Sequence, residues 1–165
     1  MFNSEEVELR KEHIFLKRKN EDLQILHVSD LHLPFSNRRL KKIENISATC
    51  TEVQLVLLTG DYIDKIESLD RFEQLIKISI NRELYYVKGN HDKKYARLID
   101  NMFNKFSNCH SVDDSAHVFK SRNKGEYLIS SWKTRNLIMP KNDQRHIVLV
   151  HNPRKIDMNA FGSTD

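Results

Sequence analysis

At 165 residues the chain is long enough for one domain with a buried core, and 39% hydrophobic and 30% charged residues indicate a globular protein with a highly charged surface. Its two cysteines, Cys50 and Cys109, are too few and too far apart for a disulfide framework or a thiolate zinc site, which favours a reducing compartment. The net charge of +4 is scattered, and its densest basic cluster, at residues 38–42, indicates a solvated helix face rather than a nucleic-acid or membrane patch.

Nothing in the sequence predicts a leader or a membrane span. No apolar run approaches the ~20 residues that a span needs. Residues 1–10 are acidic and lack the basic region and apolar stretch of a signal peptide. We therefore expect a cytoplasmic protein without a transmembrane segment.

Four short apolar runs, rich in β-branched or aromatic residues, predict buried strands at residues 23–29, 55–59, 84–88 and 146–150. Gly60 directly follows the second run, and Gly89 directly follows the third. A glycine at these places allows a sharp turn and leaves room for a ligand.

Helical spacing of apolar residues fills the gaps between these strands. One stripe follows Asn37, a predicted N-cap, and a second follows Ser68. The clearest stripe, from Tyr95 to Phe106, follows Asp92, which we predict to be the N-cap of that helix. All three stripes indicate core packing.

This alternation of strands and helices predicts an α/β fold with parallel crossovers. Between residues 111 and 132 the pattern changes to two or three strands, with a turn near residues 123–125, which predicts a second, partly antiparallel sheet. No repeat, low-complexity tract or linker divides the chain, so residues 1–165 are expected to form a single domain.

Residues typical of metal ligands follow four predicted strands. They stand in the segments Asp30-Leu31-His32, Gly60-Asp61-Tyr62-Ile63-Asp64, Gly89-Asn90-His91-Asp92 and His151-Asn152-Pro153. Each segment alone is weak evidence, but in α/β sheets ligands bind beyond the carboxyl ends of the strands, where all four lie.

The mixture of carboxylates, imidazoles and one carboxamide, without thiolates, suits Mn, Fe or Zn in a catalytic site rather than a structural zinc. Two neighbouring cations need a carboxylate that bridges them. Such a pair holds a phosphate and lowers the pKa of a water toward ~7. The sequence therefore favours a two-metal hydrolase.

These segments resemble the blocks D-x-H, G-D-x-x-D and G-N-H-[DE] and the later strand-end histidine of the calcineurin-like metallophosphoesterases. The closer resemblance is to the bacterial YkuE/YaeI-like phosphohydrolases. It covers about residues 23–165 as the catalytic core, with residues 1–22 as an N-terminal strand or extension. It implies a four-layer α-β-β-α sandwich of two facing mixed sheets flanked by helices.

The resemblance also implies a role for each residue. Asp30 and His32 would hold the first metal, Asp61 would bridge both, and Asn90 and His151 would hold the second. His91 would face the substrate and protonate the leaving oxygen or stabilise the transition state. Asp64 would orient His91, although a helix-capping carboxylate is the alternative interpretation of Asp64. The cofactor would be two divalent ions (Mn, Fe or Zn), and we expect Mn to support activity in vitro.

Two departures from the family pattern stand out. Related protein phosphatases carry Arg directly after the second block, whereas this chain has Lys65. A lysine lacks the two parallel N–H donors with which arginine binds a phosphate, so a phosphoprotein substrate is disfavoured. The family's last block, G-H-x-H, is not among the 165 residues, so we expect an incomplete sandwich that lacks one imidazole at each metal.

Two functions stay open at this stage. The first is hydrolysis of a phosphomonoester or phosphodiester, with a small molecule or a lipid head group as substrate and no specific nucleic-acid or protein partner indicated. The second is a catalytically weak metal-binding scaffold of the same fold. A DNA nuclease subunit is poorly supported, because 165 residues leave no room for the insertions of such proteins.

Overall fold

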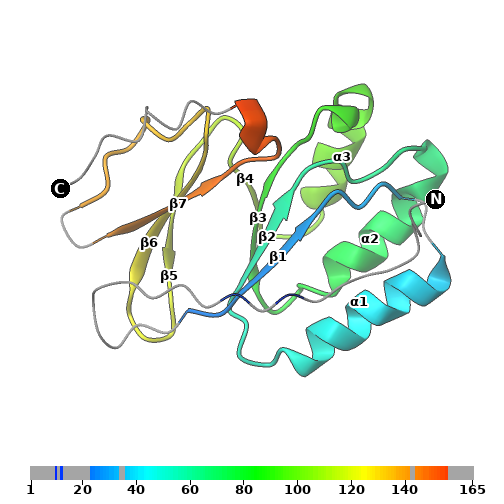
Figure 1. Cartoon of the computed structure of the whole chain (residues 1–165), viewed down its shortest axis with the longest axis horizontal. Coiled ribbons are helices and arrows are strands. Elements are labelled where there is room, and N and C mark those ends of the chain that lie inside the picture. The colour runs from blue at the N-terminus through cyan, green and yellow to red at the C-terminus, as the bar shows by residue number, and fades with distance from the viewer. Residues whose placement is uncertain (1–9, 11, 13–22, 34–35, 142–143, 156–165) are drawn as a thin grey trace.

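A computed structural model describes residues 10, 12, 23–33, 36–141 and 144–155. The predicted N-terminal strand or extension therefore lies outside the described residues, apart from Arg10 and Glu12. Two β-sheets pack face to face, and helices cover the outer face of the first (Figure 1).

The first sheet is parallel throughout. Its strand order is β1-β2-β3-β4, with bounds Ile25–Ser29, Leu55–Thr59, Glu83–Val87 and Cys109–Ser111. Three helical segments make the crossovers: α1 (Asn37–Thr49), η1 (Ile66–Ser68) with α2 (Leu69–Lys77), and η2 (His91–Tyr95) with α3 (Ala96–Phe103). Because each strand is added on the same side of the previous one, right-handed crossovers place all three helices on one face (Figure 1).

The second sheet has the order β5-β6-β7, with bounds His117–Lys120, Glu126–Ser131 and Arg145–Leu149. β5 and β6 are antiparallel, whereas β6 and β7 are parallel. A turn predicted near residues 123–125 joins β5 to β6, and Lys124 in it has a left-handed φ of 63°. A short 3₁₀ segment, η3 (Pro153–Lys155), follows β7.

The two cores lie on opposite faces of β2. Leu55 and Leu57 pack toward the second sheet, against residues such as Tyr127 and Ile129. Val56 and Leu58 pack toward the helices, in a cluster that includes Phe72 and Phe103. A strand covered on both faces buries every side chain, which explains the uninterrupted apolar run at 55–59.

The predicted α/β class and the two facing sheets are therefore confirmed. Two details differ from the expected four-layer sandwich of mixed sheets. The first sheet is purely parallel, because each of its described connections is a helical crossover. In residues 23–33, 36–141 and 144–155, every α-helix covers the first sheet, so three of the four expected layers are described.

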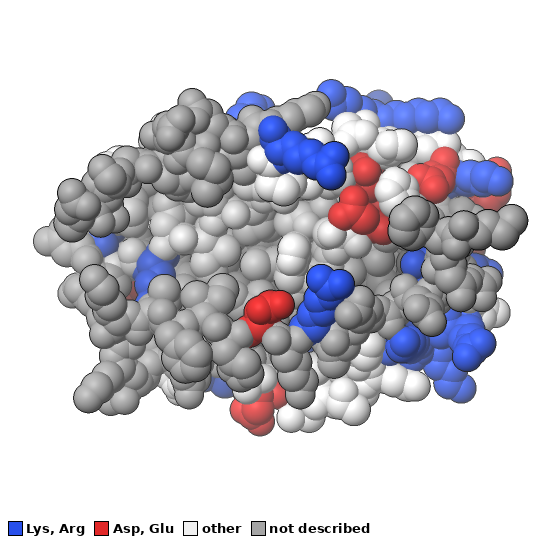
Figure 2. All heavy atoms as spheres, viewed as in Figure 1, with Lys and Arg blue, Asp and Glu red and all other residues white. Residues whose placement is uncertain are grey.

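The first helix begins one residue earlier than predicted. Ser36, rather than Asn37, is the N-cap of α1, because its extended backbone lets its Oγ accept the N–H of Arg39. The basic residues Arg38, Lys41 and Lys42 of this helix are exposed, and basic side chains cover the lower right of Figure 2, where α1 lies. No helix in the described part of the chain is long and apolar enough to cross a membrane.

Candidate metal centre

The five predicted metal ligands meet where strands β1, β2, β3 and β7 end. Oδ2 of Asp61 lies 3.2 Å from Nε2 of His151 and 3.7 Å from Nε2 of His32. Oδ1 of Asn90 lies 3.1 Å from the same nitrogen of His151. Asp30 belongs to one group with Asp61 and His151, whose ligand atoms all lie within 4.8 Å of one another.

The backbone at the ends of β1 and β2 is strained at three of the predicted ligands. Asp30, His32 and Asp61 have φ angles of 52°, 45° and 55°, and only one other described non-glycine residue has a positive φ. This left-handed conformation costs roughly 1–2 kcal/mol per residue. It persists because the two loops are joined by backbone hydrogen bonds, from Asp30 N to Gly60 O (3.2 Å) and from His32 N to Asp61 O (2.8 Å).

Two glycines let the loops after β2 and β3 touch. A Cβ on Gly60 would lie 2.6 Å from the Cα of Gly89 and 2.7 Å from Nδ1 of His151, and the φ of Gly60 is +76°. A Cβ on Gly89 would lie 2.1 Å from Oδ1 of Asp61. The sharp turn predicted at Gly60 is present. The space at both glycines, predicted to be left for a ligand, is filled by the neighbouring loop and by His151 instead.

The prediction that Asp92 is the N-cap of α3 is wrong. The Asp92 side chain is fully buried and accepts the backbone N–H groups of Asp61 (2.7 Å), Tyr62 (2.8 Å) and Gly89 (2.8 Å). The N-cap position of α3 belongs to Tyr95, because the 3₁₀ segment η2 intervenes. Burial raises the pKa of Asp92, while the three N–H donors favour its charged form. Asp92 thus holds the ends of β2 and β3 together beneath the predicted ligands.

Each of the two histidines predicted to bind metal directs its Nε2 toward Asp61. Nδ1 of His151 lies 2.9 Å from the carbonyl oxygen of Thr59, which can only accept, so Nδ1 carries the proton and Nε2 presents its lone pair. Nδ1 of His32 lies 3.0 Å from Oδ1 of Asp64, and this hydrogen bond is the main cause that raises the pKa of His32.

His91 lies beside this cluster with an exposed side chain. Its backbone N–H donates to Oδ1 of Asp61 (3.0 Å), and its ring meets that of His32 edge to face, with 5.3 Å between centroids. Ligand atoms of His91, His32 and Asp64 lie within 4.8 Å of one another. Among the described residues, the side chain of Asp64 hydrogen-bonds to His32 rather than to His91, which it was predicted to orient.

Acidic side chains gather on the surface above the ends of β1 and β2, in the upper right of Figure 2. A family model described as calcineurin-like phosphoesterase matches residues 23–163, which is most of the chain. The chain belongs to the calcineurin-like phosphoesterase family. Phosphoester hydrolysis with divalent metals is the activity associated with this family, and the two groups of ligand-type residues at the strand ends agree with it.

Other comparisons add little. A solved structure, the protein of unknown function AQ665 from Aquifex aeolicus, is 17% identical, with 73% of this chain and 67% of that chain covered and a TM-score of 0.34. A similarity this low carries no argument about fold or function. No protein with a curated description matches the chain.

The donor atoms of the predicted ligands have separations that suit a cation. Donors each ~2.1 Å from a cation, at tetrahedral or octahedral angles, lie about 3.0–3.4 Å apart. The separations of His151 from Asp61 (3.2 Å) and from Asn90 (3.1 Å) fall in this range, and that of His32 from Asp61 (3.7 Å) is slightly longer. The residues present therefore fit divalent metal binding, with the buried Asp61 between the two histidines.

Proposed function

We propose that the chain hydrolyses phosphate esters, either monoesters or diesters, with two divalent cations. Asp30, His32 and Asp61 would hold one ion, and Asp61, Asn90 and His151 the other. Mn is the ion that we expect to support activity in vitro, and a small molecule or a lipid head group is the proposed substrate. The motif resemblance to YkuE/YaeI-like phosphohydrolases supports this assignment.

The position of Asp61 is the observation that carries the proposal. Asp61 is 4% exposed, and its carboxylate faces imidazoles that follow strands of the two different sheets. Burying a carboxylate costs free energy unless its charge is paired. The N–H of His91 donates to Oδ1 of Asp61, which leaves Oδ2 to face the two imidazoles. Asp61 would therefore be the residue that both cations share, with His32 on one side of its Oδ2 and His151 on the other.

When bound, the two cations would neutralise phosphate charge and lower the pKa of a water, so that a nucleophile forms near neutral pH. The chain would do the remaining work. His91 would protonate the leaving ester oxygen, for which its exposed ring beside the ligands is suitably placed. Asp64 would hold His32 in the tautomer that directs Nε2 toward Asp61.

Hydrolysis of p-nitrophenyl phosphate and bis(p-nitrophenyl) phosphate in excess Mn tests this function. Asp61→Asn should abolish turnover and reduce the bound Mn, because both metal positions lose their bridging charge. His91→Ala should lower kcat by about 10²–10⁴, the range for a general acid, with the metal content nearly unchanged. Loss of Mn in the His91 variant would show that His91 is a ligand and that the assigned roles are wrong.

His110→Ala is the matched control. It makes the same change at a histidine on β4 whose Nε2 pairs with Glu83 (2.8 Å), away from the ligands. Its turnover should stay within about twofold of the unaltered chain, within the effect of an ordinary substitution. A chain that binds Mn in stoichiometric amounts but hydrolyses neither ester would instead be the metal-binding scaffold, and the proposed function would fail.

A further inference from the structure

A groove of about 390 Å³ lies directly beside the metal centre. Gly89 and His151 belong to both, so the groove continues outward from the proposed phosphate position. Its walls come from segments that follow β3, β4, β6 and β7, which are brought to one end of the two sheets. The volume lies within the ~300–1,000 Å³ of small-molecule sites.

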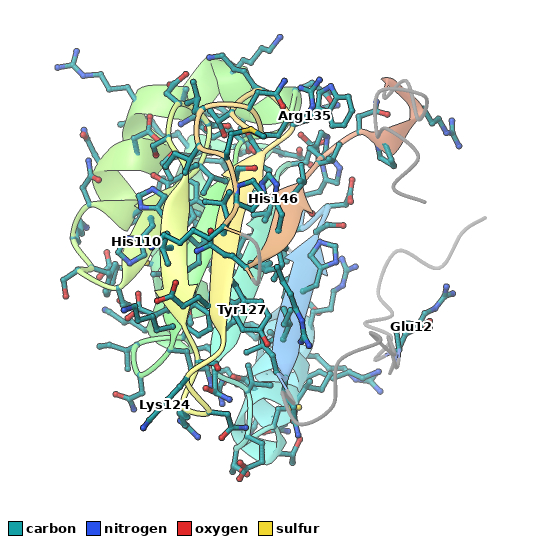
Figure 3. The ribbon with its side chains drawn as sticks, turned by 90° about the vertical axis from the view of Figure 1, so that its left-hand side faces the viewer. Glu12, His110, Lys124, Tyr127, Arg135 and His146 are labelled. Atoms are coloured by element: carbon teal, nitrogen blue, oxygen red, sulfur yellow. The ribbon has the colours of Figure 1, made fainter. Side chains whose placement is uncertain are left out.

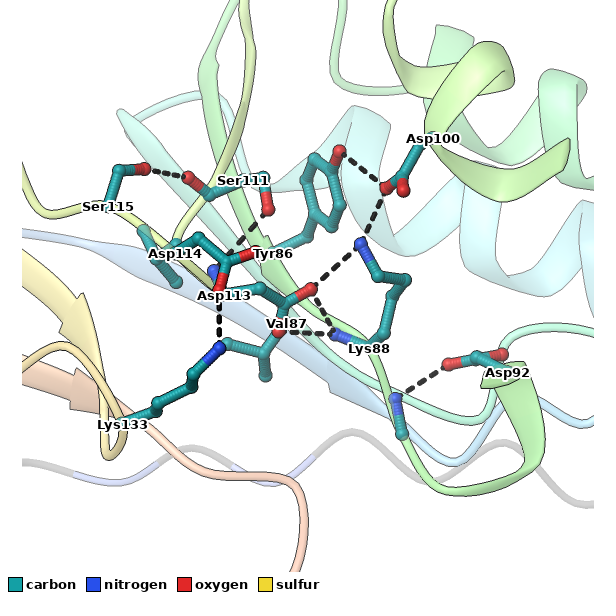
Figure 4. A network of polar contacts seen from close by, with 12 residues as sticks. Tyr86, Val87, Lys88, Asp92, Asp100, Ser111, Asp113, Asp114, Ser115 and Lys133 are labelled. Carbon is teal, nitrogen blue, oxygen red and sulfur yellow. Dashed lines mark hydrogen bonds and ion pairs between the residues drawn. The ribbon is translucent and has the colours of Figure 1, made fainter. Parts of the chain in front are cut away.

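Neighbouring carboxylates neutralise two of the lysines that line this groove. Nζ of Lys88 lies 2.6 Å from Asp100 and 2.9 Å from Asp113, and Lys133 pairs with Asp114 (Figure 4). Burial lowers the pKa of Lys88, but hydrogen bonds to the two carboxylates outweigh it and raise that pKa overall. These pairs fix the walls of the groove and leave little charge for a ligand.

Lys93 differs from these two lysines. It lines the groove from η2, is exposed, and has no ion pair among the residues that the structure describes. Its neighbour Lys94 is directed elsewhere, with Nζ 5.0 Å from the centroid of the Tyr95 ring. Lys93 is therefore the groove cation suited to an anionic substituent of a ligand.

The aromatic wall of the groove is Trp132, the single tryptophan of the chain. Its backbone N–H donates to Leu149 O (3.1 Å), which ties it to the end of β7. The guanidinium of Arg135 lies 3.7 Å from the centroid of the indole and donates to the carbonyl of Trp132. Figure 3 shows Arg135 at the opposite end of the second sheet from Lys124, in the turn before β6. The indole is therefore held in place with the guanidinium over one face, and the part of the ring that lines the groove can contact a planar group.

We propose that this groove binds the organic group of the substrate, with a planar aromatic ring against Trp132 and an anionic substituent near Lys93. The proposal rests on the proposed function, since the ester phosphate would lie at the metal centre. It identifies the substrate class as aromatic phosphate esters, of which aryl phosphates and nucleotides are the two sources. An ester with a purely aliphatic group would lack the ring contact.

The single tryptophan allows a direct test, because selective excitation of the indole reports on this groove alone. We expect saturable quenching by adenosine 5′-monophosphate and by phenyl phosphate. Ribose 5-phosphate and inorganic phosphate, which carry the phosphate without a ring, should cause little change. Quenching by adenosine monophosphate alone would identify a nucleoside as the bound organic group. Quenching by both adenosine monophosphate and phenyl phosphate would identify an aryl group in general. Equal responses to adenosine monophosphate and ribose 5-phosphate would overturn the proposal.

Calorimetric titration of variants separates stacking from an indirect change in fluorescence. Trp132→Leu should weaken the binding of adenosine monophosphate about tenfold, in line with the loss of one base–aromatic stack, and Trp132→Phe should restore most of it. Lys93→Gln should weaken the binding of 4-carboxyphenyl phosphate, whose ring carries an anionic substituent, several-fold, whereas Lys94→Gln, the matched control, should not. Unchanged affinity in correctly folded Trp132→Leu protein would refute the groove assignment.

The same preparations distinguish this proposal from the proposed function. Hydrolysis of bis(p-nitrophenyl) phosphate without a ring-dependent fluorescence change would leave the phosphoesterase assignment intact and refute the groove. Ring-dependent quenching without hydrolysis of any ester would support the groove as an aromatic binding site and refute the proposed function.

Discussion

Replacement of Asp92 by asparagine tests how the strand ends are held beneath the metal centre. The carboxylate is buried and accepts three backbone N–H groups, two at Oδ2 from Asp61 and Gly89 and one at Oδ1 from Tyr62. Asparagine has nearly the same shape but only one acceptor oxygen. In its best orientation the amide oxygen replaces Oδ2, and the NH₂ group then faces the N–H of Tyr62.

The expected loss of stability follows from these contacts. Hydrogen bonds to a charged acceptor contribute about 1.5–3 kcal/mol each, and neutral ones about 0.5–1.5 kcal/mol. A buried N–H left without an acceptor costs about 1–3 kcal/mol. Burial also disfavours the carboxylate, as the raised pKa of Asp92 shows, so part of the loss is recovered on neutralisation. We expect Asp92→Asn to lower the free energy of unfolding by about 2–4 kcal/mol.

Urea denaturation followed by circular dichroism measures this change. Asp70→Asn is the matched control, since Asp70 is exposed in the first turn of α2 and contributes at most about 1 kcal/mol through the helix dipole. Because the N–H of Asp61 is one of the three donors, the Asp92 variant should also bind Mn more weakly. A free energy of unfolding within about 0.5 kcal/mol of the unaltered chain would refute the reasoning.

Two further predictions concern packing and pH. Gly89→Ala places a Cβ 2.1 Å from Oδ1 and 2.5 Å from N of Asp61, so the variant should lose about 1–3 kcal/mol of stability together with bound Mn. Full Mn content in that variant would contradict the close approach of the two loops. Hydrogen bonds from Lys105 and Lys77 lower the pKa of Glu73 from 4.5 to about 2, so these ion pairs stabilise the fold above pH 4.5 and lose their effect as the pH falls toward 2. The Tm of the Glu73→Gln variant should therefore fall less than that of the unaltered chain as the pH is lowered from 4.5 toward 2. Parallel Tm profiles for the variant and the unaltered chain would show that the ion pairs contribute nothing measurable.

Much of this protein was determined by local sequence. The uniformly apolar run at 55–59 predicted a strand buried on both faces, because only such a strand can leave no side chain in water. Gly60 predicted a turn with a backbone conformation that other residues adopt only with strain. The φ of Gly60 is +76°. The polar residues that follow the strands predicted that ligand-type side chains would gather at one edge, because parallel strands end at a common edge.

Only the tertiary structure decided how those residues face one another. His151 reaches Asn90, 61 residues away in the chain, because the second sheet packs on the first and directs the end of β7 toward β3. Asp92 looks like a helix cap in sequence, yet packing turns its carboxylate toward three N–H groups, two of them 30 and 31 residues away.

The same limit applies to Asp64 and Trp132. Asp64 has two histidines within reach of its carboxylate, and the loop geometry after β1 selected His32 as its partner. Trp132 follows β6 with no sequence signal of a ligand site, and it lines a groove because segments after four strands converge there. Local propensity and side-chain chemistry are properties of short segments, whereas the partner of each polar group depends on which segments the folded chain brings together.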